Sequence, residues 1–254
     1  MRAIILTIAL VLVIGAHTRN ATAEAVDLEI MLAVDISGSI DPFEAKLQRE
    51  GYLKALTHPS VIAAITSGKH RRVAISYMEW AGELSQNTLV DWTVVSNVAT
   101  ARAFAGKIGA IPITTSHWTS ISGAIDHAVK AFAKNPHKGS RRVLDISGDG
   151  RNNDGGKLGP ARTRAFALGI IINGLPIMND RPNPYGLPID RKLDEYYKTR
   201  VIGGRGAFII VAKGFEEFAE AIRAKLVREI ADRGGPVTDR VVDRTAPGAR
   251  TRMP

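Results

Sequence analysis

A run of short oxygen-bearing side chains, DISGSID, spans Asp35 to Asp41 directly after the apolar run LEIMLAV. Asp35, Ser37 and Ser39 alternate along this string. Gly38 permits a turn because it has no Cβ to clash with the backbone, so the three side chains can converge as the chain leaves a strand. Such oxygen atoms are hard donors and suit a hard divalent cation. The string therefore predicts three ligands of one metal site.

The last aspartate of this string is predicted to have a different role. Asp41 is a favourable helix N-cap, Pro42 suits the first helical position, and Glu44 stands where a capping box requires an acidic side chain. We therefore assign Asp41 to the start of a helix and not to the metal.

The quartet DISG occurs a second time, at Asp145 inside VLDISGDG, again after an apolar run. Asp145 alternates with Ser147 and Asp149 along a predicted strand. Four residues of strand separate Asp145 from Asp149, or roughly 13 Å, so the two carboxylates cannot share one ion. A carboxylate buried inside a strand needs a partner, such as an arginine or backbone donors.

The elements that must position these residues alternate along the chain. Continuous apolar runs are typical of strands buried on both faces of a parallel sheet, and apolar residues at three- and four-residue spacing, as in 121–132 and 215–230, are typical of helices. This alternation predicts a doubly wound, three-layer α/β fold of Rossmann-like type, mostly parallel, with a hairpin that adds one antiparallel edge strand. The expected strands are Leu28–Val34, Val73–Trp80, Leu89–Val95, Val143–Ser147, Ile170–Leu175 and Phe208–Ala212.

The D-x-S-x-S pattern that begins at Asp35 resembles the first motif of von Willebrand factor type A (VWA) domains, which bind a cation at a metal-ion-dependent adhesion site (MIDAS). TSISGAI resembles the family's second motif and places the family threonine at Thr119. Asp149-Gly150 matches the third motif, an aspartate-glycine pair after the fourth strand. The motifs occur in the family's order, and the resemblance covers about residues 27–231. It implies a VWA-like fold.

The resemblance also implies how the site works. The metal ligands would be Asp35, Ser37, Ser39, Thr119 and Asp149. Two carboxylates and three hydroxyls favour Mg²⁺, with Mn²⁺ or Ca²⁺ as substitutes, over Zn²⁺ or Cu²⁺. With water counted, such a set leaves one coordination position open. In the family a carboxylate from a partner protein fills it, and the resemblance implies the same here. The alternative is a site that only braces the loops.

Some residues near these motifs depart from the family or have an open role. Gly148 stands where the family has a hydroxyl before its last Asp-Gly, which predicts a looser backbone there. Asn152 and Asn153 are interpreted as a solvated turn. His117 is interpreted as an exposed loop residue, and Trp118, which borders the Thr119 loop, is a candidate partner contact.

A distinctive string, YYxxxVIGGxGAF, begins at Tyr196. Together with SGDGxNN it resembles a subgroup of secreted bacterial VWA-like proteins known only as a domain of unknown function. Its glycines precede a predicted strand and do not lead from a strand into a helix, so the geometry of a phosphate loop is absent. We predict a structural turn. The proline-rich segment Pro176–Asp190 is predicted to be a loop on the same face as the metal site.

Three regions are predicted along the chain. Residues 1–23 are typical of a signal peptide cleaved after Ala23, with a basic start, an apolar run and the small-x-small motif Ala21-Thr22-Ala23. The apolar run is shorter than the roughly 20 residues that span a membrane, although an uncleaved anchor is the alternative. Residues 24–233 form the VWA-like domain. Residues 234–254, poor in apolar side chains, are predicted to be a disordered tail.

Composition narrows the functional classes. The chain has no cysteine, so disulfides and cysteine chemistry are excluded, and an exported bacterial protein, periplasmic or secreted, fits this composition. The net charge of +9 comes without a dense basic block interleaved with aromatic residues, so nucleic acid is not the expected partner.

Three hypotheses for the function follow. The first is a metal-dependent protein-binding module without enzymatic activity. The second is a Mg²⁺-dependent hydrolase or phosphatase, although the sequence offers no nucleophile-base pair and no second metal cluster. The third is an envelope-surface binder that acts through its charge and has a purely structural metal.

Overall fold

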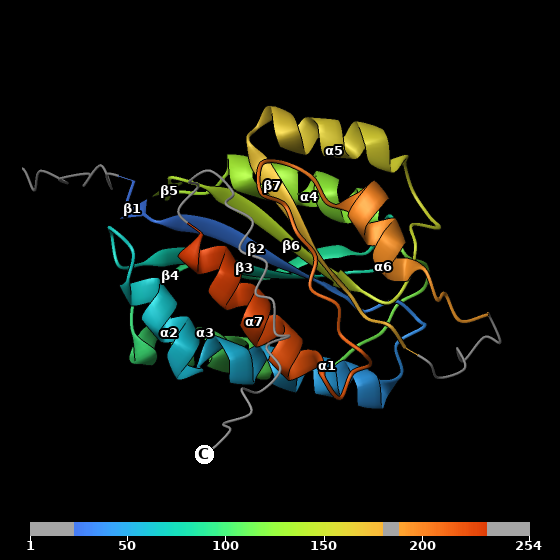
Figure 1. Ribbon diagram of the computed structural model, residues 1–254, viewed down its shortest axis with the longest axis horizontal. Coiled ribbons are helices and arrows are strands. Elements are labelled where there is room, and N and C mark those ends of the chain that lie inside the picture. The colour runs from blue at the N-terminus through green and yellow to red at the C-terminus, as the bar shows by residue number, and fades with distance from the viewer. Residues whose placement is uncertain (1–22, 180–187, 233–254) are drawn as a thin grey trace, which may run out of the picture.

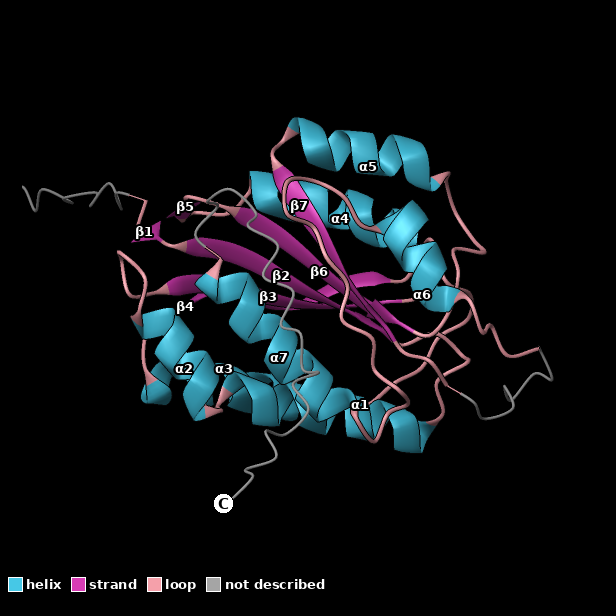
Figure 2. Cartoon of the chain, viewed as in Figure 1, coloured by secondary structure: helices cyan, strands magenta, loops and turns pink. Residues whose placement is uncertain are grey.

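The computed structural model describes residues 23–179 and 188–232. Its centre is a five-stranded sheet with the strand order β4-β3-β2-β6-β7 (Figure 1, Figure 2). All neighbouring strands are parallel except β3 and β4, which form the predicted antiparallel hairpin at the edge. The strands are β2 (Leu28–Asp35), β3 (Val73–Trp80), β4 (Gln86–Val95), β6 (Arg142–Gly148) and β7 (Ile170–Pro176).

Helices cover both faces of this sheet. On one face lie α1 (Pro42–Leu56), α2 (Pro59–Thr66), α3 (Val98–Gly109) and α7 (Phe218–Ala231). On the other lie α4 (Ile121–Ala133), α5 (Leu158–Ala167), α6 (Leu193–Tyr196) and the π-helical turn η1 (Tyr197–Val201). Two short strands, β1 (Ala25–Val26) and β5 (Lys138–Gly139), form a separate parallel pair. The predicted three-layer α/β fold is confirmed.

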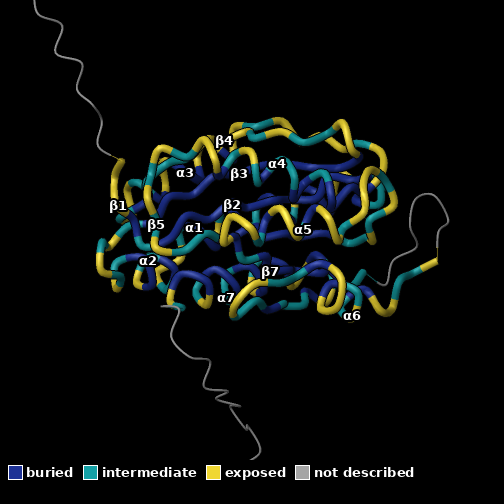
Figure 3. Tube along the Cα trace, turned by 90° about the horizontal axis from the view of Figure 1, so that it is seen from above, coloured by how far each residue is buried: buried dark blue, intermediate teal, exposed yellow. Residues whose placement is uncertain are grey.

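Burial follows from this layering. Every residue of β2 and β3 is buried, because helices pack on both sides of the central strands. Edge strand β4 instead has exposed and partly buried positions along most of its length. Figure 3 shows the buried sheet enclosed by helices whose outer faces are exposed. The continuous apolar runs of the sequence therefore correspond to the central strands.

The start of α1 agrees with its sequence signal. The side chain of Asp41 accepts hydrogen bonds from the backbone N–H groups of Phe43 and Glu44, both at 2.8 Å. In return, the Glu44 carboxylate accepts from the backbone N–H of Asp41 at 3.0 Å. This reciprocal capping box confirms that Asp41 starts the helix.

The expected strand Phe208–Ala212 is not a strand. The segment runs beside β7 and makes isolated bridges at Ile209 and Ala212. A continuous ladder is interrupted for two reasons. The backbone N–H of Phe208 donates to the side chain of Asn173 at 3.1 Å, and Pro176 has no N–H to donate. The preceding glycine-rich string is a turn, as predicted, in which Gly203 pairs with Ile172 of β7.

Three regions of the chain that carry predictions lie outside the described residues. They are the predicted signal peptide, apart from Ala23, residues 180–187 of the predicted loop 176–190, and the predicted tail at 234–254. Within the part of the chain that the structure describes, no helix is both long enough and apolar enough to cross a membrane.

Candidate metal centre

The sequence-predicted ligands come from the carboxyl ends of two adjacent central strands. Asp35 is the last residue of β2, and Asp149 directly follows β6. The two strands are parallel neighbours, with Val34 opposite Ser147. Because the chain continues from β2 to β3 on one side and β6 joins β2 on the other, this crevice is the topological switch point of the sheet. Ligands of doubly wound folds bind at such a point.

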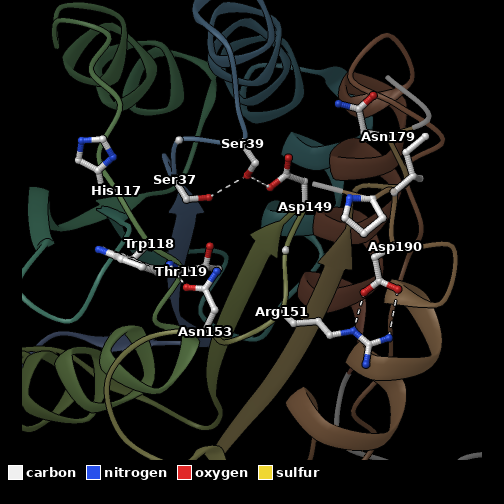
Figure 4. Close-up of a pocket in the computed structure, with 14 residues that line it drawn as sticks. Ser37, Ser39, His117, Trp118, Thr119, Asp149, Arg151, Asn153, Asn179 and Asp190 are labelled. Carbon is white, nitrogen blue, oxygen red and sulfur yellow. Dashed lines mark hydrogen bonds and ion pairs between the residues drawn. The ribbon is translucent and has the colours of Figure 1, made fainter. Parts of the chain in front are cut away.

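Hydrogen bonds join the D-x-S-x-S turn to the second aspartate. The backbone N–H of Ser37 donates to Oδ1 of Asp35 at 2.7 Å, so the turn folds back on its own carboxylate. The Ser39 hydroxyl donates to Oδ1 of Asp149 at 2.6 Å and lies 3.2 Å from the hydroxyl of Ser37. Figure 4 shows the side chains of Ser37, Ser39 and Asp149 pointing toward one another. Asp35, Ser37, Ser39 and Asp149 are thus brought together.

Thr119 reaches the same place from a third segment. It is buried in the loop before α4, and Ser120 caps that helix. A Cβ placed on Gly150 would lie 3.4 Å from Thr119 Oγ1, so the threonine hydroxyl faces the Asp149-Gly150 turn. All five residues predicted as ligands therefore gather at one strand-end cleft.

Two asparagines fix the Thr119 loop, which is more than the solvated turn expected from sequence. Oδ1 of Asn153 accepts from the backbone N–H of Thr119 at 2.8 Å, and the Asn153 N–H donates to the Thr119 carbonyl at 2.9 Å. Oδ1 of Asn152 accepts from the N–H of Ser122 in the first turn of α4 at 2.8 Å. The only sequence signal for this role was the position of both amides, two and three residues after Gly150 of the aspartate-glycine motif.

The electrostatics of the site favour a cation. Burial, and then the charge of Asp149, raise the pKa of Asp35 well above its usual range. Burial also raises the pKa of Asp149 to about 6; the hydrogen bond from Ser39 opposes this shift, and the charge of the nearby Glu44 adds to it by a smaller amount. Oδ2 of Asp35 is buried and has no hydrogen-bond partner among the described residues. Two desolvated carboxylates with an unused oxygen are a donor set that fits a divalent cation.

Gly148 provides space, which differs from the looser backbone expected of it. A Cβ at this position would lie 2.7 Å from Oδ2 of Asp35 and 2.8 Å from Oη of Tyr197. Any side chain at this position would therefore collide with both atoms. The absence of a side chain therefore lets the Asp35 carboxylate and a tyrosine hydroxyl approach the end of β6.

Asp145, the aspartate of the second DISG string, belongs to a separate buried cluster on the α7 face. Its partner is a lysine, and not the arginine or backbone donors considered from sequence. Nζ of Lys225 lies 2.5 Å from Oδ1 of Asp145 and 2.6 Å from Oε1 of Glu229. The side chains of all three residues are fully buried. One ammonium group therefore faces two carboxylates.

Four of the predicted ligands, Ser37, Ser39, Thr119 and Asp149, line a cleft of about 620 Å³, and Asp35 is fully buried. Exposed His117 and Trp118 lie on one side, and Arg151 and Asp190 lie on the other, joined by two hydrogen bonds of 2.5 and 3.1 Å (Figure 4). Both described ends of the 176–190 loop reach this cleft, through Asn179 and through residues 188–190. Across the described ranges 23–179 and 188–232, no three His, Cys, Asp or Glu side chains gather as a metal site. The candidate centre is therefore one of two aspartates and three hydroxyls.

Similar solved structures place this fold among VWA domains. Proximal thread matrix protein 1 from the mussel byssus, with a zinc-occupied MIDAS motif, is 11% identical with a TM-score of 0.61 over 82% of this chain and 49% of that protein. A von Willebrand factor type A protein from Catenulispora acidiphila is 14% identical with a TM-score of 0.56, over 81% of this chain and 43% of that one. The chain thus spans about half the length of these proteins, and at such identities the likeness shows the fold alone.

An aerotolerance-related membrane protein from Bacteroides fragilis is similar over nearly its whole length. It is 22% identical with a TM-score of 0.51, and the match covers 78% of this chain and 98% of that protein. The chain therefore has a VWA-like fold. Residues 25–234 match the family described as "protein of unknown function (DUF1194)", and the chain belongs to that family. No curated protein matches the sequence significantly.

Proposed function

We propose that this chain is an exported protein-binding module that holds a divalent cation at the carboxyl ends of β2 and β6 and offers it to an acidic group of a partner protein. The observation that carries the proposal is the meeting of two desolvated aspartates, Asp35 and Asp149, with hydroxyls from two segments at one open cleft. Carboxylates are rarely buried together unless a cation or a shared proton balances them.

The cation would be held by Asp35, Ser37, Ser39, Thr119 and Asp149. Mg²⁺ is the expected ion, with Mn²⁺ or Ca²⁺ as substitutes, because every donor is a hard oxygen. When bound, the cation supplies the positive charge that the two aspartates lack, together with an open coordination position. The residues of the chain do the rest: Ser39 orients Asp149 through its 2.6 Å hydrogen bond, and Asn153 fixes the loop that carries Thr119.

The rim of the cleft supports a partner that is both acidic and apolar. Trp118 is 66% exposed and has a left-handed backbone conformation with φ of +65°. An exposed indole offers a large apolar contact area, and strained residues of this kind cluster at binding sites. On the opposite rim, the Arg151 guanidinium is already paired with Asp190, so the acidic group of the partner is assigned to the open position of the cation. We therefore propose that the partner presents an aspartate or glutamate beside an apolar side chain.

The proposal includes the location of the protein. Residues 1–23 would direct export and be removed, and residues 24–233 would act as one module in the periplasm or outside the cell.

A calorimetric titration of residues 24–254 with Mg²⁺, Mn²⁺, Ca²⁺ and Zn²⁺ tests the cation site. We expect the wild type to bind a divalent cation and Asp35→Ala and Asp149→Asn to lose binding. Asp41→Asn is the matched control, because asparagine also caps helices and this side chain belongs to α1. Wild-type protein that binds no divalent cation would refute the proposal, as would binding by Asp35→Ala that equals the wild type.

The partner chemistry is tested with short peptides that carry glutamate or glutamine beside leucine. Binding through the cation requires glutamate, disappears with a chelator and survives high salt. Binding through net charge alone fades with ionic strength instead. Hydrolysis of a phosphate ester that depends on Asp149 would contradict the binding module and favour the hydrolase.

A further inference from the structure

Tyr197 is a fully buried tyrosine that points its hydroxyl at the back of the candidate metal centre. Its Oη has no hydrogen-bond partner among the described residues, and neither does Oδ2 of Asp35. Both atoms lie within 2.8 Å of the point where a Cβ of Gly148 would stand. Buried polar groups almost always have partners. Two unpartnered polar atoms at one glycine are therefore a feature that core packing does not explain.

Two glycines on neighbouring strands make room for this tyrosine. A Cβ on Gly174 of β7 would lie 2.8 Å from Cδ1 of the Tyr197 ring, and a Cβ on Gly148 of β6 would lie 2.8 Å from its Oη. The ring therefore crosses β7 at one glycine and ends over β6 at the other. A phenylalanine would fill the same space without burying a hydroxyl, so the hydroxyl itself calls for a role.

The neighbouring Tyr196 holds the same end of the sheet. Its hydroxyl accepts the backbone N–H of Asn152 at 3.2 Å, and the guanidinium of Arg151 lies 4.9 Å from its ring centroid. The tyrosine pair at the junction of α6 and η1 thus contacts the turn after Asp149 with one member, while the other reaches toward Asp35. Both residues of the Tyr-Tyr string in the sequence therefore lie at the end of the sheet that carries the candidate metal centre.

The hydrogen-bonding capacities of Tyr197 Oη and Asp35 Oδ2 match, because one can donate and the other can accept. A tyrosine hydroxyl keeps its proton at neutral pH, because its ordinary pKa is about 10, and it can therefore donate one hydrogen bond. Oδ1 of Asp35 already accepts from the backbone N–H of Ser37. Oδ2 is the oxygen of that carboxylate with acceptor capacity to spare.

We propose that Tyr197 is a positioning residue of the cation site: in the cation-bound protein its hydroxyl donates to Oδ2 of Asp35 and holds that carboxylate in its ligating orientation, whereas neither atom has a hydrogen-bond partner among the described residues of this structure. The hydroxyl reaches this place from η1, and the absence of a side chain at Gly148 of β6 leaves room for it. This inference rests on the proposed function, because it requires that Asp35 binds a cation.

The test compares Tyr197→Phe with the wild type in two measurements on residues 24–254. Groups that orient a metal ligand typically contribute 10- to 100-fold to metal affinity, so we expect Mg²⁺ and Mn²⁺ affinities to fall by about that factor. In the metal-free protein the same substitution removes a buried hydroxyl without a partner, so the unfolding temperature should stay the same or rise. A role in packing alone would not produce these two opposite effects.

Tyr52→Phe is the matched control. Tyr52 is also fully buried, but its hydroxyl lies 3.1 Å from the hydroxyl of Ser147, with which it forms a hydrogen bond. We expect this variant to lose stability and keep its metal affinity. Adding Mg²⁺ should change the ultraviolet absorbance of Tyr197, because its hydroxyl lies at the cation site. This change in absorbance should disappear in Tyr197→Phe and persist in Tyr52→Phe.

The outcomes separate the two proposals. If the wild type binds no cation, the proposed function fails, and this inference fails with it. If the wild type binds and Tyr197→Phe binds equally well, only the role of Tyr197 is refuted. A parallel loss of metal affinity and metal-free stability in Tyr197→Phe would also overturn it, since this would indicate a structural residue. Gly174→Ala, which displaces the ring without contacting Asp35, should weaken metal binding as well.

Discussion

Glu229→Gln should make the protein's stability less dependent on pH. Lys225 lies between Asp145 and Glu229, and the three side chains are fully buried. One positive charge against two negative charges leaves an excess negative charge in the core. Burial, and then the charge of Asp145, raise the pKa of Glu229 to about 7, although Lys225 acts in the opposite direction.

The size and sign of the effect follow from proton binding. The pKa of Glu229 is about 7 in the folded protein, against an ordinary value of 4.5. Between these two pH values the folded state binds one more proton than the unfolded chain, so stability falls as pH rises. At about 1.4 kcal/mol per pH unit, the wild type loses about 3 kcal/mol. This contribution is fully present below pH 4.5, is lost as pH rises through 7, and then stays level.

Urea unfolding of residues 24–254 in a chelator, from pH 4.5 to 8.5, measures this effect. A glutamine at position 229 stays neutral and keeps an amide oxygen for the hydrogen bond from Asn173. The variant should therefore gain about 3 kcal/mol relative to the wild type across this range. Glu220→Gln is the control on the same helix, because Arg223 lowers the pKa of Glu220. A difference between Glu229→Gln and the wild type that does not change with pH would refute the reasoning.

Three further predictions concern the site. Gly148→Ala should lower the free energy of unfolding by about 1–3 kcal/mol, because the new Cβ would overlap the Asp35 carboxylate and the Tyr197 hydroxyl. Gly159→Ala is the control, because the space around Gly159 is open. Equal urea midpoints for the two variants would contradict this prediction. Asn153→Ala should cost about 1 kcal/mol and weaken cation binding, because the Thr119 loop loses its hydrogen bond; calorimetry showing wild-type affinity would contradict it. Trp118→Ala should keep cation affinity and weaken binding of the glutamate peptide; unchanged peptide binding would remove the indole from the interface.

The predictions that succeeded rest on local patterns. The capping box at Asp41 involves residues three positions apart, and the central strands were visible as continuous apolar runs. Phe208–Ala212 shows the limit of such patterns. The apolar run does not reveal which strand it will lie beside. Next to β7, the Asn173 side chain accepts the backbone N–H of Phe208, and Pro176 has no N–H to donate to the segment.

The sequence by itself determined the fold class, the D-x-S-x-S turn and the start of α1, because periodicity, glycine and capping act between residues close together in the chain. Only the tertiary structure decided which distant groups share a neighbourhood. In the folded chain Asp145 pairs with Lys225, Asn153 accepts a hydrogen bond from the Thr119 loop, and the Tyr197 hydroxyl lies next to Gly148. The physical reason is that these contacts depend on strand order and helix packing, and polar groups buried by that packing take whichever partner the fold places within reach.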